Sequence, residues 1–355
     1  MRKRLAALLS ALLCLALLTA CGTQGGTPSG ETPAVPAPAD QTPADAAPAD
    51  QTPAEPVPAA DGEEAESGEE AAGPVTVTDD LGNTVTFEKT PERVAVLTAS
   101  FAETWLLAGG KLCATVSDAW DDFDLDLEGV SDLGTYMHVS MELLFEADPD
   151  LVILSSNTSP HLEMKDTLEK AGIRTLWFGV SGFPDYLRML KACTDVTGRE
   201  DLFERNGLEV EKRVEAAKAE AAAHVAEEGA PQVLYLRAAA SAVRAKGSDG
   251  TVLGEMLADI GCVNIADGSD LLEDLSIEKI IETDPEYVLI VQQGDDVEAM
   301  ERLLEETLTG NPAWAGLRAV KEGRVFFLDK QLYHLKPNAR WGEAYEKLVA
   351  LFWPA

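Results

Sequence analysis

The chain has 355 residues, 46% of them hydrophobic, which is ordinary for a globular protein and enough for two α/β lobes. Its net charge is −34. The first 20 residues carry three basic side chains, and residues 22–74 carry eleven acidic and no basic ones, which leaves −26 for residues 75–355. A body this acidic repels nucleic acid and anionic lipid headgroups, which excludes a nucleic-acid-binding function and favours a basic partner.

Residues 1–20 have the features of a targeting signal. A basic start is followed by an apolar run over residues 5–18 that is too short to span a membrane as a stable helix. The segment Leu18-Thr19-Ala20-Cys21 resembles the lipobox of bacterial lipoproteins, which implies cleavage before Cys21 and lipid attachment to that residue. Several acyl chains on one residue would hold the protein to a membrane. The alternative is an ordinary secretory signal with an unrelated cysteine.

Residues 21–74, from the lipidated cysteine onward, are predicted to form a disordered tether. The segment is dominated by Pro, Ala, Thr, Gly and acidic residues, and the run Pro-Ala-Asp-Gln-Thr-Pro-Ala occurs at 38–44 and again at 48–54. Few apolar side chains and unopposed negative charge predict an extended, self-repelling chain that cannot fold alone.

Residues 75–199 are predicted to form the first lobe. Residues 75–87 alternate apolar and polar side chains around a Gly-Asn turn, which is typical of a hairpin. A short apolar run at 94–97 predicts a buried strand, and Ser100 and Glu103 predict a capping box at the start of the next helix. A helix that begins at the carboxyl end of a strand is where open α/β sheets bind ligands.

Two stretches, residues 140–154 and 276–290, share one pattern. A serine, two glutamates, an aspartate and a proline recur in register, 136 positions apart. Each copy predicts a helix that begins at the serine, ends before the proline and is followed by a buried strand. Unbroken apolar strands after helices indicate parallel sheets buried on both faces. Two such units far apart predict two α/β lobes, each with a mainly parallel sheet, and a ligand cleft between them.

A long helix is predicted to bridge the lobes over residues 200–229. This stretch is rich in Ala, Glu and Lys, with Gly207 as its weak point, and its modest apolar stripe suits a surface helix. Residues 230–355 then form the second lobe. It is predicted to open with a strand at 232–236 and to close with a helix at 341–353.

Four segments of the body carry a resemblance to a known family. They are Arg93-Val94-Ala95-Val96 with Ser100-Phe101-Ala102-Glu103; Asp148-Pro149-Asp150-Leu151-Val152-Ile153; Leu253-Gly254-Glu255-Met256-Leu257 with Gly261-Cys262-Val263-Asn264; and Trp314 with Leu317-Arg318-Ala319-Val320-Lys321-Glu322-Gly323-Arg324-Val325. In this order they resemble the substrate-binding proteins of bacterial ABC importers for iron–siderophores, haem and cobalamin. The resemblance implies two α/β lobes bridged by a long helix, small cleft closure, and capture of an iron chelate.

The resemblance also implies partners and a location. The protein would be a monomer on the outer face of the cytoplasmic membrane, held there only by its lipid anchor, and it would deliver its ligand to a permease with an ATPase. In the family one exposed glutamate on each lobe docks onto permease arginines. By position, Glu255 and Glu163 are the candidates here, and the alternative for both is an ordinary solvated helix residue.

No catalytic constellation or cofactor motif is visible, so an enzyme is the weakest hypothesis. The four histidines, at 138, 161, 224 and 334, are scattered, which argues against a site for a bare metal ion. After the leader, three cysteines remain without paired spacing, and we interpret them as small buried hydrophobic residues.

Local positive charge in the second lobe predicts the ligand-binding residues. Arg237, Arg244 and Lys246 follow its first strand, and Lys330, Lys336 and Arg340 surround Tyr333 and His334 after its last strand. Planar guanidinium groups suit carboxylates or catecholates, and aromatic rings can cover the apolar faces of a chelate. The equivalent loops of the first lobe carry Phe101, Trp120, Tyr136 and His138. Surface charge balance, and core packing of Phe101 and Trp120, are the alternatives.

The ligand itself stays open among several classes. A ferric siderophore is the leading hypothesis. Haem is an alternative, because Tyr136, His138, Tyr333 or His334 could ligate its iron, and cobalamin is another. A tethered envelope sensor or adhesion module that reuses the fold is a hypothesis of a different class.

Overall fold

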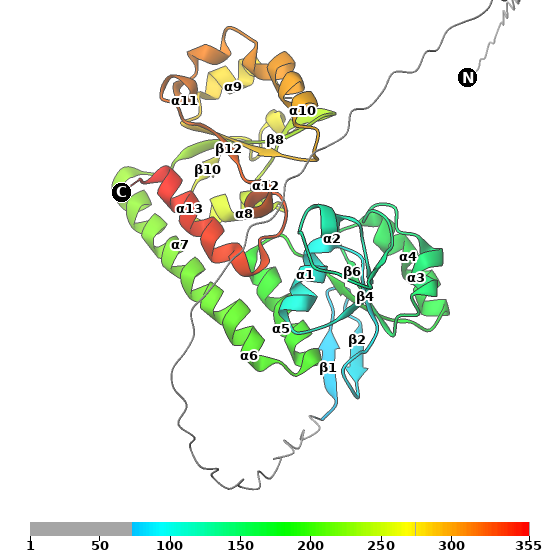
Figure 1. Cartoon of the computed structure of the whole chain (residues 1–355). Coiled ribbons are helices and arrows are strands. Elements are labelled where there is room, and N and C mark those ends of the chain that lie inside the picture. Colours follow the sequence, from blue (N-terminus) through cyan, green and yellow to red (C-terminus); the bar gives the residue numbers. More distant parts are fainter. Residues whose placement is uncertain (1–72, 274, 355) are drawn as a thin grey trace, which may run out of the picture. The chain divides into compact units, whose positions relative to one another are not determined.

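The computed structural model describes residues 73–273 and 275–354 (Figure 1). They lie within one compact unit, Ser67–Ala355. The expected signal peptide, Cys21 and the tether lie outside the described residues. No helix in the described part of the chain combines the length and the apolar character needed to cross a bilayer.

The first lobe is built on a five-stranded, fully parallel sheet with the order β5-β4-β3-β6-β7. Its strands are β3 (Val94–Val96), β4 (Leu112–Thr115), β5 (Ser131–Asp132), β6 (Leu151–Ser155) and β7 (Arg174–Phe178). The expected hairpin precedes it as a separate antiparallel pair, β1 (Val75–Thr78) with β2 (Thr84–Phe87). Short apolar runs thus form central strands, and the alternating stretch forms a hairpin.

The second lobe has its own sheet with the order β10-β8-β11-β12, all parallel, and β9 is added antiparallel to β8. Its strands are β8 (Gln232–Ala239), β9 (Ala242–Ala245), β10 (Val263–Asn264), β11 (Tyr287–Gln292) and β12 (Val325–Leu328). Two separate, mainly parallel sheets confirm the predicted fold class.

Helices connect and cover these sheets. The first lobe has α1 (Ala99–Leu107), α2 (Asp118–Asp121), α3 (Met141–Glu146), α4 (Ser159–Lys170) and α5 (Phe183–Thr197). The second lobe has α8 (Val252–Asp259), α9 (Ile277–Thr283), α10 (Val297–Leu304), α11 (Arg318–Lys321), α12 (Lys330–Tyr333) and α13 (Trp341–Phe352). Short 3-10 turns lie at Asp270–Leu272, Trp314–Gly316 and Asn338–Arg340, and a π-helical turn at Glu305–Thr309 follows α10.

The bridging helix is interrupted by a π-helical turn. It runs as α6 (Glu200–Phe203), the π turn Glu204–Leu208 and α7 (Glu209–Glu228), beside α13 in Figure 1. Gly207 lies buried in the π turn, where an added Cβ would come within 3.0 Å of the Leu187 side chain. The glycine therefore allows the bridging helix to approach α5, a helix that was not predicted.

The two repeated units fold alike but are capped differently. In each, a helix leads into a buried strand, and the aspartate before the proline adopts a left-handed conformation, with φ of 45° at Asp148 and 43° at Asp284. The Ser140 hydroxyl accepts the Leu143 N–H at 3.3 Å, as predicted. The Ser276 hydroxyl instead donates to the Glu278 carboxylate at 2.8 Å, so the predicted cap is wrong in the second copy.

The capping box predicted at Ser100 is also wrong. Helix α1 begins at Ala99, with Thr98 as its flanking residue, and no side chain caps it. Ser100 and Glu103 lie inside the helix and face the second lobe. The Asn338 side-chain amide donates to the Ser100 carbonyl at 2.8 Å and to the Glu103 carboxylate at 2.5 Å. Asn338 is almost fully buried and thereby ties the two lobes together.

One hydrophobic core runs through both lobes. Alternate strand residues, such as Val94 and Val96 in the first lobe and Val233 and Tyr235 in the second, face this shared core. The opposite faces of the two sheets have separate clusters of their own. The bridging helix contributes its buried residues Val210, Val214, Ala217 and Ala221 to the shared core. The lobes are therefore joined by packing as well as by chain connection.

Candidate functional site

A cleft lies where the carboxyl ends of both parallel sheets meet. Its volume is about 330 Å³, at the low end of the roughly 300–1,000 Å³ typical of small-molecule sites. Both lobes line it. The first lobe contributes Thr98, Ala99, Ser100, Asp118, Asp122, Phe123, Tyr136, Ser155 and Thr158, and the second contributes Gln293, Gly294, Asp295, Lys330, His334, Leu335 and Lys336.

The first-lobe wall is made by residues at the carboxyl ends of the strands. Residues 98–100 follow β3 and begin α1, Asp118 follows β4 and begins α2, Tyr136 lies in the loop after β5, and Ser155 is the last residue of β6. Parallel strands end at one edge of the sheet, so these residues meet there. Tyr136, one of the predicted site residues, lines the cleft with 40% of its surface exposed.

Lys330 makes an ionic link between the lobes. Its Nζ lies 2.6 Å from the Asp122 carboxylate of the first lobe and 2.6 Å from the Asp295 carboxylate of its own lobe. Burial opposes its charge, but hydrogen bonds to the two carboxylates outweigh burial and raise the pKa of Lys330. Gln331 adds a second link by donating to the Asp122 carbonyl. Lys330 therefore stays protonated, and the carboxylates of Asp122 and Asp295 already balance its positive charge.

His334 and Lys336 lie in the same wall without such partners. Burial, assisted by the charges of Arg237 and nearby lysines, lowers the pKa of His334 to about 3, so the imidazole is neutral at physiological pH. Its Nδ1 is buried and has no hydrogen-bond partner among the described residues. Burial and the charge of Arg237 also lower the pKa of Lys336. An anionic ligand would stabilise this side of the cleft.

A basic pocket adjoins the cleft. It has a volume of about 410 Å³ and shares Gln293 and Gly294 with the cleft lining. Arg237, Arg244 and Lys246 line it. All three were predicted to follow the first strand of the second lobe, but β8 extends to Ala239, so Arg237 lies within it and Arg244 lies opposite in β9. The Arg237 guanidinium donates to the Tyr235 hydroxyl at 3.2 Å, while its buried Nε has no partner among the described residues. Burial, together with the charges of Arg237 and Arg244, lowers the pKa of Lys246.

Arg340 lies in a smaller side pocket of about 210 Å³ that shares Asp122, Phe123 and Lys336 with the cleft. Its guanidinium makes a two-pronged ion pair with Glu343 in α13, at 2.8 and 3.0 Å. This pairing raises the pKa of Arg340 and lowers the pKa of Glu343 to about 2. A ligand would have to compete with Glu343 for this guanidinium.

Three predicted aromatic residues do not line the cleft. Phe101 is 2% exposed because it lies on the face of α1 that packs into the shared core. Tyr333 is 4% exposed and donates its hydroxyl to the Ala344 carbonyl at 3.1 Å, which anchors α12 to α13. Trp120 is half-buried against a small cluster around Ala119. These three residues serve in packing, which for Phe101 and Trp120 was the alternative considered from the sequence.

Sequence reasoning missed Phe123, Asp118 and Asp122, which do line the cleft. For Asp118 the available signal was its position three residues after the end of β4, whereas Asp122 and Phe123 follow the four-residue α2 and carried no such signal. His138, in contrast, is exposed and lies outside the cleft lining.

The two candidate docking residues have different surroundings. Glu163 is exposed on α4. Glu255 is half-buried at the start of α8, and its carboxylate accepts the Gly250 N–H at 2.9 Å. Its side chain also approaches Gly182, where an added Cβ would come within 3.7 Å. That either residue docks onto a permease stays a prediction.

The described residues offer little to metal or thiol chemistry. They contain no group of three or more His, Cys, Asp or Glu side chains placed to hold a metal ion. Cys113, Cys193 and Cys262 are free, and burial raises the pKa of each thiol. Protonated, buried thiols act as small hydrophobic groups rather than as nucleophiles.

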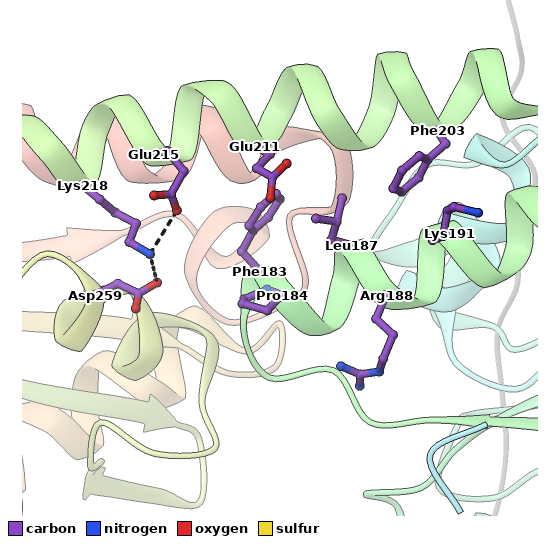
Figure 2. Close-up of a pocket in the computed structure, with 10 residues that line it drawn as sticks. All are labelled: Phe183, Pro184, Leu187, Arg188, Lys191, Phe203, Glu211, Glu215, Lys218 and Asp259. Carbon is purple, nitrogen blue, oxygen red and sulfur yellow. Dashed lines mark ion pairs between the residues drawn. The ribbon is translucent and has the colours of Figure 1, made fainter. Parts of the chain in front are cut away.

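A second groove lies along the bridging helix, away from the strand ends (Figure 2). Its volume is about 380 Å³, and Phe183, Leu187 and Phe203 give it apolar walls. Lys218 is paired with Glu215 at 3.2 Å and with Asp259 at 3.6 Å, as the dashed lines in Figure 2 show. The other lysine of the groove, Lys191, is paired with Asp195 at 2.5 Å. Both lysines are thus already paired, and none of the predicted ligand-binding residues lines the groove, so the cleft is the better candidate.

Comparison with known proteins gives consistent results. The sequence profile of the family described as "Periplasmic binding protein" matches residues 94–332. A putative ABC transporter substrate-binding lipoprotein of Bacillus subtilis, YhfQ, is 24% identical over 281 residues, 74% of this chain and 83% of the relative.

Two solved structures show the same fold. SirA of Staphylococcus aureus, complexed with staphyloferrin B, has a TM-score of 0.59 at 20% identity and covers 78% of this chain and 96% of its own. A periplasmic haem-binding protein of Pseudomonas aeruginosa has a TM-score of 0.61 at 24% identity, with coverage of 75% and 94%.

Proposed function

The chain belongs to the periplasmic binding protein family, and on this premise we propose that it captures an anionic ferric chelate in the cleft between its lobes. The chelate would carry carboxylate or catecholate groups, as ferric siderophores do. It would then be delivered to the permease of an ABC importer, and the chain itself would catalyse no reaction.

The observation that carries this proposal is unpaired positive charge at the cleft of a very acidic protein. Arg237, Lys246 and Lys336 form no ion pair with any residue in 73–273 or 275–354. Burial, and after it the neighbouring arginine charge, lowers the pKa values of both lysines, so their charged forms are unfavourable in the empty protein. A ligand that brings several anionic groups would offset this repulsion by short-range, partly desolvated contacts.

Lipid anchoring and delivery belong to the same proposal. The lipobox-like segment ending at Cys21, together with a Bacillus subtilis relative described as a lipoprotein, supports a position on the outer face of the cytoplasmic membrane. Glu163 and Glu255 remain the proposed contacts with the permease. The alternative for Cys21 is the ordinary secretory signal.

Haem is the second candidate, and one observation favours it. Of the four residues first considered as iron ligands, Tyr136 and His334 line the cleft, one from each lobe. The neutral His334 imidazole with an unpartnered Nδ1 and the Tyr136 phenol are both groups that ligate haem iron. A haem would also bring two propionates to the basic side of the cleft.

Titration of the purified full chain with four probes tests the proposal. The probes are ferric citrate, the ferric complex of a catecholate siderophore, haemin and cyanocobalamin, with quenching of tryptophan fluorescence as the readout. We expect at least one of the two ferric chelates to bind at micromolar concentration or below, and cyanocobalamin, which is neutral overall, to bind at least tenfold more weakly.

Two outcomes would replace the proposal. A Soret band that shifts on binding and is lost in His334→Ala or Tyr136→Phe would assign the cleft to haem. Failure of both ferric chelates to bind, with cyanocobalamin bound, would mean that the positive charge does not select the ligand.

A further inference from the structure

His161 is fully buried behind the first-lobe wall of the cleft, near the start of α4. Both of its ring nitrogens are nevertheless hydrogen-bonded. The Ser155 N–H donates to Nδ1 at 3.1 Å, and Nε2 lies 3.0 Å from the Tyr136 carbonyl oxygen. Because Nδ1 must accept, the proton sits on Nε2, which donates to Tyr136. The two contacts fix both the tautomer and the orientation of the ring.

Both partners of His161 are cleft residues. Ser155 ends β6, and Tyr136 lies in the loop between β5 and α3. The Tyr136 N–H is held on its other side by the Asp118 carboxylate, at 3.2 Å. Tyr136 is therefore held at its N–H by the first residue of α2 and at its carbonyl by a residue of α4. Through its bond to Ser155, His161 joins this exposed loop to β6, an inner strand of the sheet.

We propose that His161 is a positioning residue for ligand binding, which sets the place of Tyr136 in the cleft by bonding its carbonyl group while its own ring is held by the end of β6. This inference rests on the proposed binding of a ligand in the cleft. His161 does not touch the ligand and acts only through Tyr136.

The chemistry of the site explains why a histidine serves here. A buried ring can accept on one side and donate on the other without carrying a charge, and burial lowers the pKa of His161, which favours that neutral form. A buried peptide carbonyl or N–H without a partner is costly, so loss of the ring would release the loop or admit water. Either change would leave the Tyr136 side chain in several positions rather than one.

Two conservative variants separate the two contacts. His161→Gln can keep a donor near the position of Nε2 and so retain the bond to Tyr136. His161→Asn can keep an acceptor near the position of Nδ1 and so retain the bond to Ser155, but its amide is too short to reach Tyr136. Both are tested in the full chain, with three measurements: amide hydrogen exchange of residues 133–140 in the ligand-free protein, melting temperature, and affinity for ferric citrate.

For His161→Asn we expect amide exchange in residues 133–140 to rise about tenfold and affinity for ferric citrate to fall about tenfold. For His161→Gln we expect both values to stay within about threefold of wild type. In a Tyr136→Ala background the Asn substitution should have no further effect on affinity, since coupled residues are not additive.

The inference is overturned if the Asn and Gln variants lower the melting temperature equally and do not differ from each other in the amide exchange of residues 133–140 or in affinity for ferric citrate. It is also overturned if the Asn effect on affinity persists in the Tyr136→Ala background. Should the wild type fail to bind ferric citrate, the exchange of residues 133–140 still decides the role of His161, because it is measured without ligand.

Discussion

Arg237 combines two properties. Its Nε is buried without a partner among the described residues, and its charge adds to burial in lowering the pKa values of Lys246, His334 and Lys336. Such a group is unfavourable until an anion arrives. We therefore expect it to contribute to ligand affinity and not to the stability of the empty protein.

Substitution of Arg237 tests this division. We expect Arg237→Ala to weaken binding of the ferric chelate by about ten- to a hundred-fold, since a charge-assisted hydrogen bond contributes roughly 1.5–3 kcal/mol. The melting temperature of the empty protein should stay equal or rise, because repulsion is removed. Arg340→Ala is the matched control, since Glu343 already binds that guanidinium, and its effect on affinity should be smaller. Earlier melting of Arg237→Ala would mean that the arginine is structural.

His334 predicts a pH dependence of stability. Its pKa is lowered from an ordinary 6.5 to about 3, so on acidification the unfolded chain takes up the proton before the folded protein does. The stability that His334 contributes as a neutral group is therefore full above about pH 6.5 and is lost progressively as the pH falls towards 3.

Urea unfolding between pH 7 and pH 4 measures this effect. In His334→Gln the free energy of unfolding should decline less steeply with acidification than in wild type, by a slope of up to one proton. His138→Gln, a change at an exposed histidine, serves as the control and should match wild type. If the free energy of unfolding changed with pH equally in all three proteins, the lowered pKa of His334 would be contradicted.

Residue types at strand ends could be predicted from the sequence, but their orientation could not. Lys246 and Lys336 were predicted from their places after strands, and Arg237 reaches the basic pocket although β8 continues two residues beyond it. Phe101 and Tyr333 were misplaced because an aromatic ring there can face either the cleft or the core, and helix phase decides which. Phe123 was missed because α2 has only four residues and leaves no periodic signal.

Among elements, the two repeated units show how far local pattern reaches. Helix, left-handed aspartate and buried strand recur in both copies. The proline prevents the helix from continuing, and the apolar run after it forms the buried strand. Capping is not imposed in the same way. Ser140 caps its helix and Ser276 does not, since a side-chain hydroxyl can choose a nearby carboxylate over a backbone N–H.

A pair of alanine substitutions measures that difference. Loss of a serine cap costs about 1 kcal/mol, with a range of roughly 0.5–2, so Ser140→Ala should lower the free energy of unfolding by that amount. Ser276→Ala should lower it by less than half as much, because only a solvent-exposed contact with Glu278 is lost. Equal losses in the two variants, measured by urea unfolding, would show that the second serine also caps in solution.

The bridging helix was predicted from composition, but its π turn was not. A glycine in a helical stretch marks a position where the helix is less stable. Only the residue that packs against it shows why the position has no side chain. Here Gly207 lies against Leu187, so the turn lets α6 and α7 follow α5 closely. Helix α5 was not predicted, although it is 15 residues long and carries Leu187, against which Gly207 packs.

At the scale of the whole molecule, the shared core determines how the two lobes depend on each other for stability. The repeated units predicted two lobes correctly, yet sequence patterns could not show that both sheets bury one face in a common core. Residues of the first lobe, the bridging helix and the second lobe all belong to it. Neither lobe can lose its structure without exposing apolar surface of the other.

Calorimetry tests this continuity. We expect thermal unfolding of the ligand-free protein to show one transition, with calorimetric and van't Hoff enthalpies in agreement, because the core links both lobes. Lys330→Ala, which removes only a polar link at the cleft, should keep the single transition. Two resolved transitions in the wild type would show that the lobes unfold independently.

The buried tie at Asn338 has a consequence for the kinetics of capture. A cleft whose lobes share a core and a buried amide link has little room for a slow hinge step after the ligand enters. The observed association rate in stopped-flow experiments should therefore rise in proportion to chelate concentration without reaching a plateau. Affinity would then be set by how fast the chelate escapes, so a partner that accelerates escape would control the timing of delivery. A plateau at high concentration would instead reveal a closing step.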